Sequence, residues 1–143
     1  MFGLINKAKN IGNKYAGNTD FLEALCAATA LVVTADKDIQ DSEVESAIET
    51  IKGHKTVAAS FSNSQVERTF DTMLTRAKTL PGKLSLKREI NDVATKGSHE
   101  MAEDVFATAV EVACADGDIG AEEQKILVDV AGRLGVNPRD FGL

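Results

Sequence analysis

Two stretches of this chain, 80 residues apart, carry the same acidic pattern. The first is ADKDIQDSE at 35–43 and the second is ADGDIGAEE at 115–123. Over residues 23–43, eight of 21 positions are identical to the residue 80 positions further along. These identities concentrate in the turn, where the general composition of helices does not produce them. The repeat predicts a pseudo-symmetric domain in which one helix–turn–helix unit occurs twice, at about 21–51 and 101–131.

Helical periodicity runs through nearly the whole chain. Apolar residues recur at spacings of three and four, and no stretch shows the alternation of a half-buried strand. We therefore expect an all-α protein of about seven helices, with an N-terminal helix followed by two pseudo-symmetric three-helix groups. Three of the predicted helices are 2–15, 41–53 and 121–134. Two more are expected to begin after a capping residue, one after Thr19 or Asp20 and one after Ser98. The other two lie between them: one begins after Ser62 or Asn63 and stops before Pro81-Gly82, and the next begins near Leu84 and ends at Gly97. Residues 55–61 are weakly patterned and are expected to form a connection.

The length and composition favour one folded domain over residues 1–143. Apolar residues make up 43% of the chain, which is enough for a substantial core. The net charge of −6 argues against nucleic-acid binding, which requires Lys and Arg to displace counterions from phosphates. The opening residues lack the apolar core of a secretory signal, and the longest charge-free, largely apolar run, 24–35, is shorter than a membrane span of roughly 20 residues. We expect a cytoplasmic protein.

The first 15 residues carry lysines and no acid. Lys7, Lys9 and Lys14 accompany an apolar face that includes Phe2 and Ile5. Such a helix can touch an anionic membrane surface. Packing of this helix on the domain is the favoured interpretation, because three lysines and a short apolar face bind membranes weakly.

Part of the acidic pattern has a structural explanation. Ile39 and Ile119 are expected to fold back onto the base of the helix pair. Glu43 and Glu123 occupy the third helical position after Gln40 and Gly120, where an acid closes a capping box and complements the helix dipole. None of these roles requires a ligand.

The aspartates are less easily explained. Asp36 and Asp116 follow the C-terminal ends of helices, where the dipole disfavours negative charge. Three interpretations stay open: turn chemistry alone, an acidic face that docks on a partner, and a cation site. An EF-hand is excluded, because its bidentate Glu follows the first Asp by eleven residues and here the spacing is seven. Any cation would have to lie between the two turns, and oxygen ligands favour Ca²⁺, Mg²⁺ or Mn²⁺.

No catalytic motif is present. Cys26 and Cys114 form no CxxC pair and lie in apolar helical stretches, so both are expected to be buried reduced thiols. His54 and His99 lack partners at ligand spacing, and no nucleophile motif surrounds a serine. A thiol enzyme is therefore disfavoured, and we expect a protein without enzymatic activity.

The two acidic turns, the opening MFGLINKAKNIGNK and the ending LGVNPRDFGL together resemble the tellurite-resistance TerB family. The resemblance implies an all-helical domain with an acidic surface suspected of metal binding. It further implies a non-enzymatic stress-response adaptor in a membrane-associated complex, at the inner face of the cell membrane. The implied partners are the membrane-embedded protein TerC or a similar protein and other tellurite-resistance proteins. A dedicated divalent-cation sensor is the alternative function.

The resemblance carries over to six turn positions as candidate metal ligands. They are Asp36, Asp38, Glu43, Asp116, Asp118 and Glu123. This chain departs from the family pattern at Lys37, where a glycine is usual, and at Gln40 and Gly120, where small polar caps are commoner. Because Lys37 can pair with a neighbouring aspartate, the second turn is the better candidate.

Overall fold

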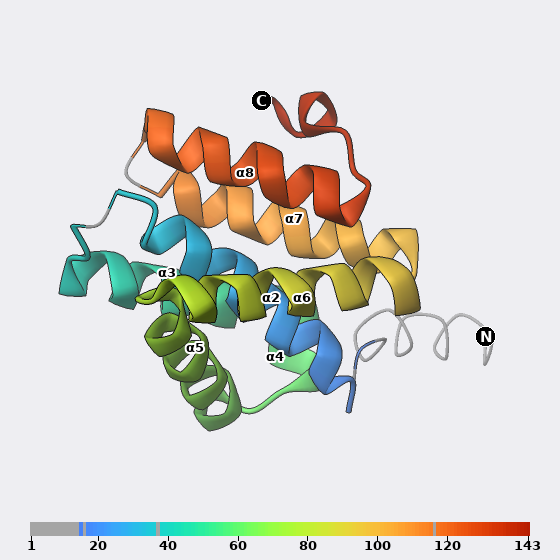
Figure 1. The fold of residues 1–143 in the computed structure, drawn as a ribbon. Coiled ribbons are helices and arrows are strands. Elements are labelled where there is room, and N and C mark those ends of the chain that lie inside the picture. The colour runs from blue at the N-terminus through green and yellow to red at the C-terminus, as the bar shows by residue number, and fades with distance from the viewer. Residues whose placement is uncertain (1–14, 16, 37, 116) are drawn as a thin grey trace.

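The computed structural model describes residues 15, 17–36, 38–115 and 117–143, which form seven α-helices, one short 3₁₀ helix and no strand (Figure 1). The all-α prediction is confirmed. The elements are α2 (Thr19–Val33), α3 (Asp41–Gly53), α4 (Lys55–Ser60), α5 (Asn63–Ala77), α6 (Leu80–Lys96), α7 (His99–Ala113), α8 (Ala121–Leu134) and the 3₁₀ helix η1 (Pro138–Phe141).

The helix α2 forms the centre of the core. Nearly every one of its side chains is buried, and it packs on α5, α6 and α7 (Figure 1). This burial follows from a sequence that is apolar all round. The predicted cap at Thr19 or Asp20 is wrong, because the Asn18 side chain accepts the Phe21 backbone N–H at 3.1 Å. Asn18 is as favourable a helix-capping residue as Thr19 or Asp20, and it lies one residue before Thr19.

The sequence repeat is visible in the helix boundaries. When the 80-residue shift is applied, α2 overlays α7 from first to last residue, and α3 and α8 begin at equivalent positions. The second helix of each copy contacts the first helix of the other: α3 contacts α7, and α8 contacts α2. The two copies therefore share a core, and their turns lie at the same end of the bundle (Figure 1).

The connection between α5 and α6 differs from the prediction. Pro81 and Gly82 do not separate two helices but lie in the first turn of α6, which begins at Leu80. The Thr79 hydroxyl caps this turn by accepting the Gly82 N–H at 3.1 Å. A proline in the first turn costs nothing, since its missing N–H would have no helical partner. The short link brings Gly82 against the backbone of Arg76, where a Cβ atom would lie 1.8 Å from the carbonyl oxygen.

Residues 55–61 also differ in part from the expected connection, because 55–60 form α4. Its Val57 is fully buried, which anchors the six-residue helix to the core. The predicted N-terminal helix lies outside the described residues except for Tyr15. The Tyr15 ring stacks on Phe21 with 3.9 Å between centroids, and its hydroxyl donates to Asp104 Oδ2 at 2.6 Å.

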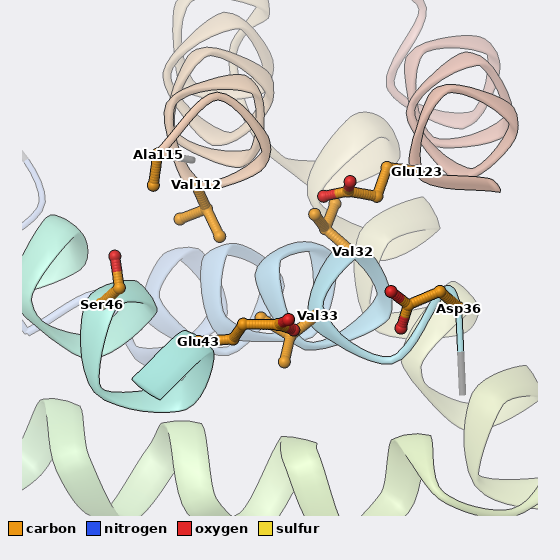
Figure 2. Close-up of a pocket in the computed structure, with 8 residues that line it drawn as sticks. All are labelled: Val32, Val33, Asp36, Glu43, Ser46, Val112, Ala115 and Glu123. Atoms are coloured by element: carbon orange, nitrogen blue, oxygen red, sulfur yellow. The ribbon is translucent and has the colours of Figure 1, made fainter. Parts of the chain in front are cut away.

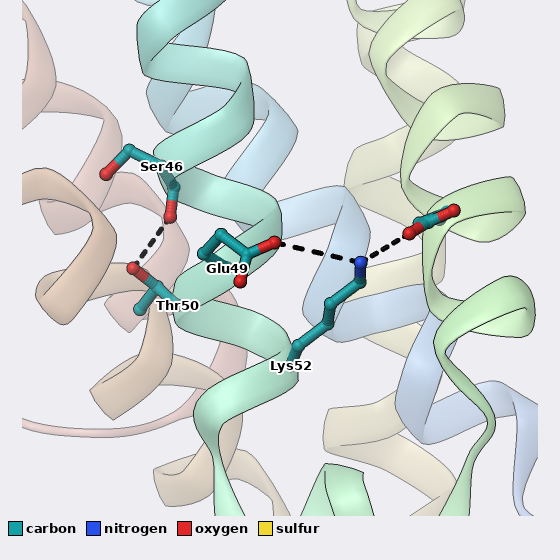
Figure 3. Close-up of polar contacts among 5 residues, drawn as sticks. Ser46, Glu49, Thr50 and Lys52 are labelled. Atoms are coloured by element: carbon teal, nitrogen blue, oxygen red, sulfur yellow. Dashed lines mark hydrogen bonds and ion pairs between the residues drawn. The ribbon is translucent and has the colours of Figure 1, made fainter.

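A lysine on α3 links that helix to α5. Lys52 Nζ lies 3.8 Å from Glu49 Oε1 and also forms an ion pair with Glu67 of α5 (Figure 3). Glu67 raises the pKa of Lys52, mainly because its carboxylate accepts a hydrogen bond from the Lys52 ammonium group. In the same region the Thr50 hydroxyl donates to the Ser46 carbonyl at 2.8 Å (Figure 3). Of these contacts, the Lys52–Glu67 ion pair links the C-terminal end of α3 to α5.

The length and hydropathy of the helices bear on membrane insertion. Among the described residues, no helix is both long enough and apolar enough to cross a bilayer. Even α2, the most apolar helix, has only 15 residues, whereas a span requires about 20.

Candidate functional site

A small polar pocket lies between the two acidic turns. Its volume is about 80 Å³, and its floor is formed by valines from α2 and α7. The residues that line it are Val32, Val33, Asp36, Glu43, Ser46, Val112, Ala115 and Glu123. Figure 2 shows the carboxylates of Asp36, Glu43 and Glu123 directed toward the same space from the first turn, α3 and α8. Acidic groups from both copies of the repeat therefore face one pocket.

In the first turn, one aspartate is used partly by the backbone. Asp36 Oδ1 accepts the Asp38 N–H at 3.1 Å, which is the hydrogen bond of an Asx-turn. Asp38 is exposed, and its Oδ2 accepts from Gln40 Nε2 at 3.1 Å. Ile39 packs against the core, as the pattern predicted. Turn chemistry thus accounts for one oxygen of Asp36 and leaves the rest of that carboxylate facing the pocket.

In the second turn, the glutamate caps its helix as predicted. Glu123 Oε1 accepts the Gly120 N–H at 3.1 Å and so closes the first turn of α8. Gly117 has a positive φ of 104°, which disfavours any residue with a side chain. Ile119 packs against the core like Ile39. Glu123 therefore combines a structural role with a position at the pocket.

The six predicted ligands do not all lie in the same environment. Asp36, Glu43 and Glu123 line the pocket, whereas Asp38 and Asp118, which are exposed as Asp36 also is, do not. Asp116 lies outside the described residues.

Sequence reasoning missed Ser46, which lies one helical turn after Glu43 and adds a hydroxyl to the pocket. The three-residue spacing on α3, which puts both side chains on one face, was the available signal.

The donor set fits a hard cation in composition. The pocket lining offers carboxylate and hydroxyl oxygens, no sulfur or nitrogen ligand, and no Lys or Arg among its described residues. The pocket has room for several waters, since one water requires only about 10–15 Å³. However, no three Asp, Glu, His or Cys side chains of the described residues are close enough to hold an ion together. An ion in this pocket would therefore be coordinated in part through water or through groups outside the described residues.

A second polar groove lies between α2, α5 and α6. Glu23 and Glu89 are hydrogen-bonded there, and Arg76 Nη1 lies 3.8 Å from Glu89 Oε1. Burial raises the pKa of Glu23, and the charge and hydrogen bond of Glu89 raise it further, while Arg76 opposes the shift. Burial and the neighbouring Glu89 therefore both disfavour the charged form of Glu23.

The two cysteines do not share an environment. Cys26 is fully buried in α2, and burial raises the pKa of its thiol. The prediction of burial is wrong for Cys114, which is exposed because it caps the C-terminal end of α7 rather than facing the core. His99 pairs with Glu103 one turn along α7, with 3.4 Å between Nε2 and Oε1.

A family model matches most of the chain. No curated protein and no solved structure matches the chain. The family model of the tellurite resistance protein TerB matches residues 22–143, which include both acidic turns and all seven described α-helices except the start of α2. The chain therefore belongs to the TerB tellurite-resistance family.

Proposed function

We propose that this chain is a non-enzymatic tellurite-resistance domain that binds a divalent cation between its two acidic turns. The observation that carries the proposal is the shared pocket, which carboxylates of both repeats face. Oxygen ligands and a partly hydrated ion suit Mg²⁺, Ca²⁺ or Mn²⁺. Asp36, Glu43 and Glu123 are the proposed ligands, and water would occupy the remaining coordination positions of the ion.

Charge supports this proposal. Three carboxylates around a volume of about 80 Å³ repel one another. A divalent cation would remove the repulsion and add attraction, so it would bind the native state in preference to the unfolded chain. At a free cation concentration 100 times the dissociation constant, this linkage stabilises the fold by about 2.7 kcal/mol.

The test is thermal unfolding of the metal-free protein during titration with CaCl₂, MgCl₂ or MnCl₂. We expect one of these ions to raise the Tm of the wild type. Asp36→Asn and Glu43→Gln should weaken this response, and Asp36→Asn should raise the Tm of the metal-free protein because it removes repulsion. Asp71→Asn is the matched control: it removes one charge from an exposed site on α5, far from the pocket in the sequence and not among its lining residues.

Two results would refute the cation site. The first is no Tm rise at millimolar concentrations of all three ions. The second is a Tm rise that Asp36→Asn and Asp71→Asn reduce equally. Such a result would indicate that the ions screen the negative charge of the whole protein and do not bind between the turns.

A second function, docking on a TerC-like membrane protein from the cytoplasm, is supported by exposed charge at the same end. Asp38, Asp41, Glu45 and Asp118 are all exposed there. Within the described residues none of these four forms an ion pair. Such a surface complements basic cytoplasmic loops and accelerates association with them.

Co-purification with a co-expressed TerC-like protein tests this docking. Asp41→Asn/Glu45→Gln should reduce recovery of the partner, and the effect of the wild-type charges should weaken as salt rises. Asp71→Asn/Asp92→Asn is the control, with the same loss of charge from exposed positions on α5 and α6. Equal recovery by the two double variants would exclude the acidic end from docking.

A further inference from the structure

Two exposed leucines lie at the start of α6. Leu80 is 72% exposed and Leu84 is 48% exposed, and the only other large apolar side chain this exposed among the described residues is Val128 of α8. Leu80 and Leu84 are one helical turn apart, on a different side of the helix from the buried Leu86 and Ile90. They therefore protrude together from one end of the helix, next to the exposed Pro81.

The charge around these leucines is opposite to that of the whole protein. Residues 76–88 contain five Lys or Arg and no acid, in a chain whose net charge is −6. Lys78 and Arg88 are exposed and form no ion pair within the described residues. Arg88 follows Leu84 by four residues and so continues the same stripe of α6.

The helix terminus adds to this positive potential. Leu80 is the first residue of a 17-residue helix, and the N-terminal end of a helix carries partial positive charge. Protruding leucines flanked by exposed cations are the combination that binds a membrane surface: apolar groups enter the boundary between headgroups and acyl chains, and cations attract anionic lipids.

We propose that Leu80, Leu84, Lys78 and Arg88 form a contact site for an anionic lipid surface. The site goes beyond the proposed cation and docking functions and requires neither of them. An anionic membrane fits the patch better than a second copy of this chain, because a second copy would have to offer an apolar groove with acidic groups around it. The apolar groove on α8 is lined by Ala121, Gln124, Lys125 and Val128 and carries a lysine rather than acids.

The position of the patch links it to the first acidic turn. Lys78 and Lys83 line a groove with Thr34 and Ile39, so the residues around Asp36 lie beside the patch. At physiological salt, charges more than about 8–10 Å apart are largely screened. The negative charge of the nearby turn therefore repels anionic lipids at the patch more than the rest of the acidic surface does. A cation bound at the turns would reduce this opposition. Lipid binding should therefore occur without a divalent cation and should increase with one if the cation site exists.

The experiment is co-sedimentation of the full chain with vesicles of phosphatidylcholine, with or without about one-third phosphatidylglycerol, in EDTA and in CaCl₂. We expect binding to the anionic vesicles only. Leu80→Ser/Leu84→Ser and Lys78→Glu/Arg88→Glu should each lower the partition coefficient about tenfold.

Two control variants each make one substitution of the same kind away from the patch. Val128→Ser removes an exposed apolar side chain from α8, and Lys96→Glu reverses an exposed charge at the other end of α6. Both should bind within about twofold of the wild type. Circular dichroism melting verifies that every variant is folded, which is expected because all the altered side chains are exposed.

The outcomes separate this proposal from the cation proposal. Binding in EDTA that requires the leucines supports the lipid site, whatever CaCl₂ does to the Tm. A Tm rise in CaCl₂ with no vesicle binding overturns the lipid site and leaves the cation site intact. Binding that Val128→Ser and Leu80→Ser/Leu84→Ser reduce equally also overturns it. A wild-type dimer that Leu80→Ser/Leu84→Ser converts to a monomer assigns the patch to a second copy and overturns the proposal as well.

Discussion

Replacement of Gly82 by alanine should destabilise the protein, although alanine is the better helix former. A Cβ atom at this position would lie 1.8 Å from the Arg76 carbonyl oxygen and 2.6 Å from its carbon. Both are backbone atoms, so no side-chain rotation relieves the clash, and the α5–α6 link has to shift. Overpacking of this kind typically costs about 1–3 kcal/mol. We place Gly82→Ala at about 3 kcal/mol because the contact is with backbone.

The helix preference of alanine offsets part of this cost. Alanine in place of glycine inside a helix is worth about 0.5–1 kcal/mol, which leaves a net loss of about 2 kcal/mol for Gly82→Ala. For a chain of this size the corresponding fall in Tm is about 4–8 °C. Gly132→Ala in α8 is the matched control, because a Cβ there would meet nothing within 4 Å. It should raise the free energy of unfolding by about 0.5–1 kcal/mol.

Urea unfolding followed by circular dichroism measures both variants under identical conditions. The expected result is a change of opposite sign for the two substitutions. If both raised the free energy of unfolding by the same amount, the close approach of α6 to Arg76 would be refuted. The Thr79 cap and the position of Leu80 at the start of α6 would then also need revision, because they depend on the same short link.

Two further predictions concern titratable groups. Burial raises the pKa of Glu23 above its usual 4.5, so the charged carboxylate destabilises the fold at pH 7. This destabilisation disappears as the pH falls through the raised pKa toward 4.5, because the carboxyl group is then protonated in the folded protein. Glu23→Gln should therefore be more stable than the wild type in urea at pH 7 and equal to it at about pH 4; an equal difference at both pH values would contradict the assignment. Cys114 should react with a thiol reagent in the native protein and Cys26 only after unfolding, since the first is exposed and the second fully buried; mass spectrometry of the labelled peptides identifies the site, and native labelling of Cys26 would contradict its burial.

Most of the helices could be predicted because the apolar pattern and the turn residues agree. The boundaries of α3 and α8 follow from acids in the first turn and from Gly53 and Gly135 at the ends. Gly135 adopts the left-handed conformation expected of a C-terminal cap. The repeat added a second, independent reason, since it required the two helix–turn–helix units to have the same length.

The errors have local physical causes. Pro81 is compatible both with the end of one helix and with the first turn of the next, and the sequence does not distinguish these. Cys114 directly follows the last residue of α7, and the apolar periodicity of a helix does not predict in which direction a side chain at its end points. A six-residue helix is too short to be stable by itself, so α4 depends on the burial of Val57.

The candidate site was only partly predictable. The repeat indicates that both acidic turns lie at one end, but it does not indicate which acids face each other. Asp36 and Asp38 are two residues apart in one turn, yet only Asp36 lines the pocket. Ser46 comes from the helix rather than the turn, so a search restricted to the acidic motif excludes it.

The crossed packing of the two repeat copies has a consequence for how this chain folds. Because α3 contacts α7 and α8 contacts α2, each helix–turn–helix unit covers part of the apolar surface of the other. A chain cut between α5 and α6 should give two fragments that are poorly ordered apart and regain structure on mixing. Unfolding should be one cooperative event, so that hydrogen exchange in α2 and α7 reports the same opening.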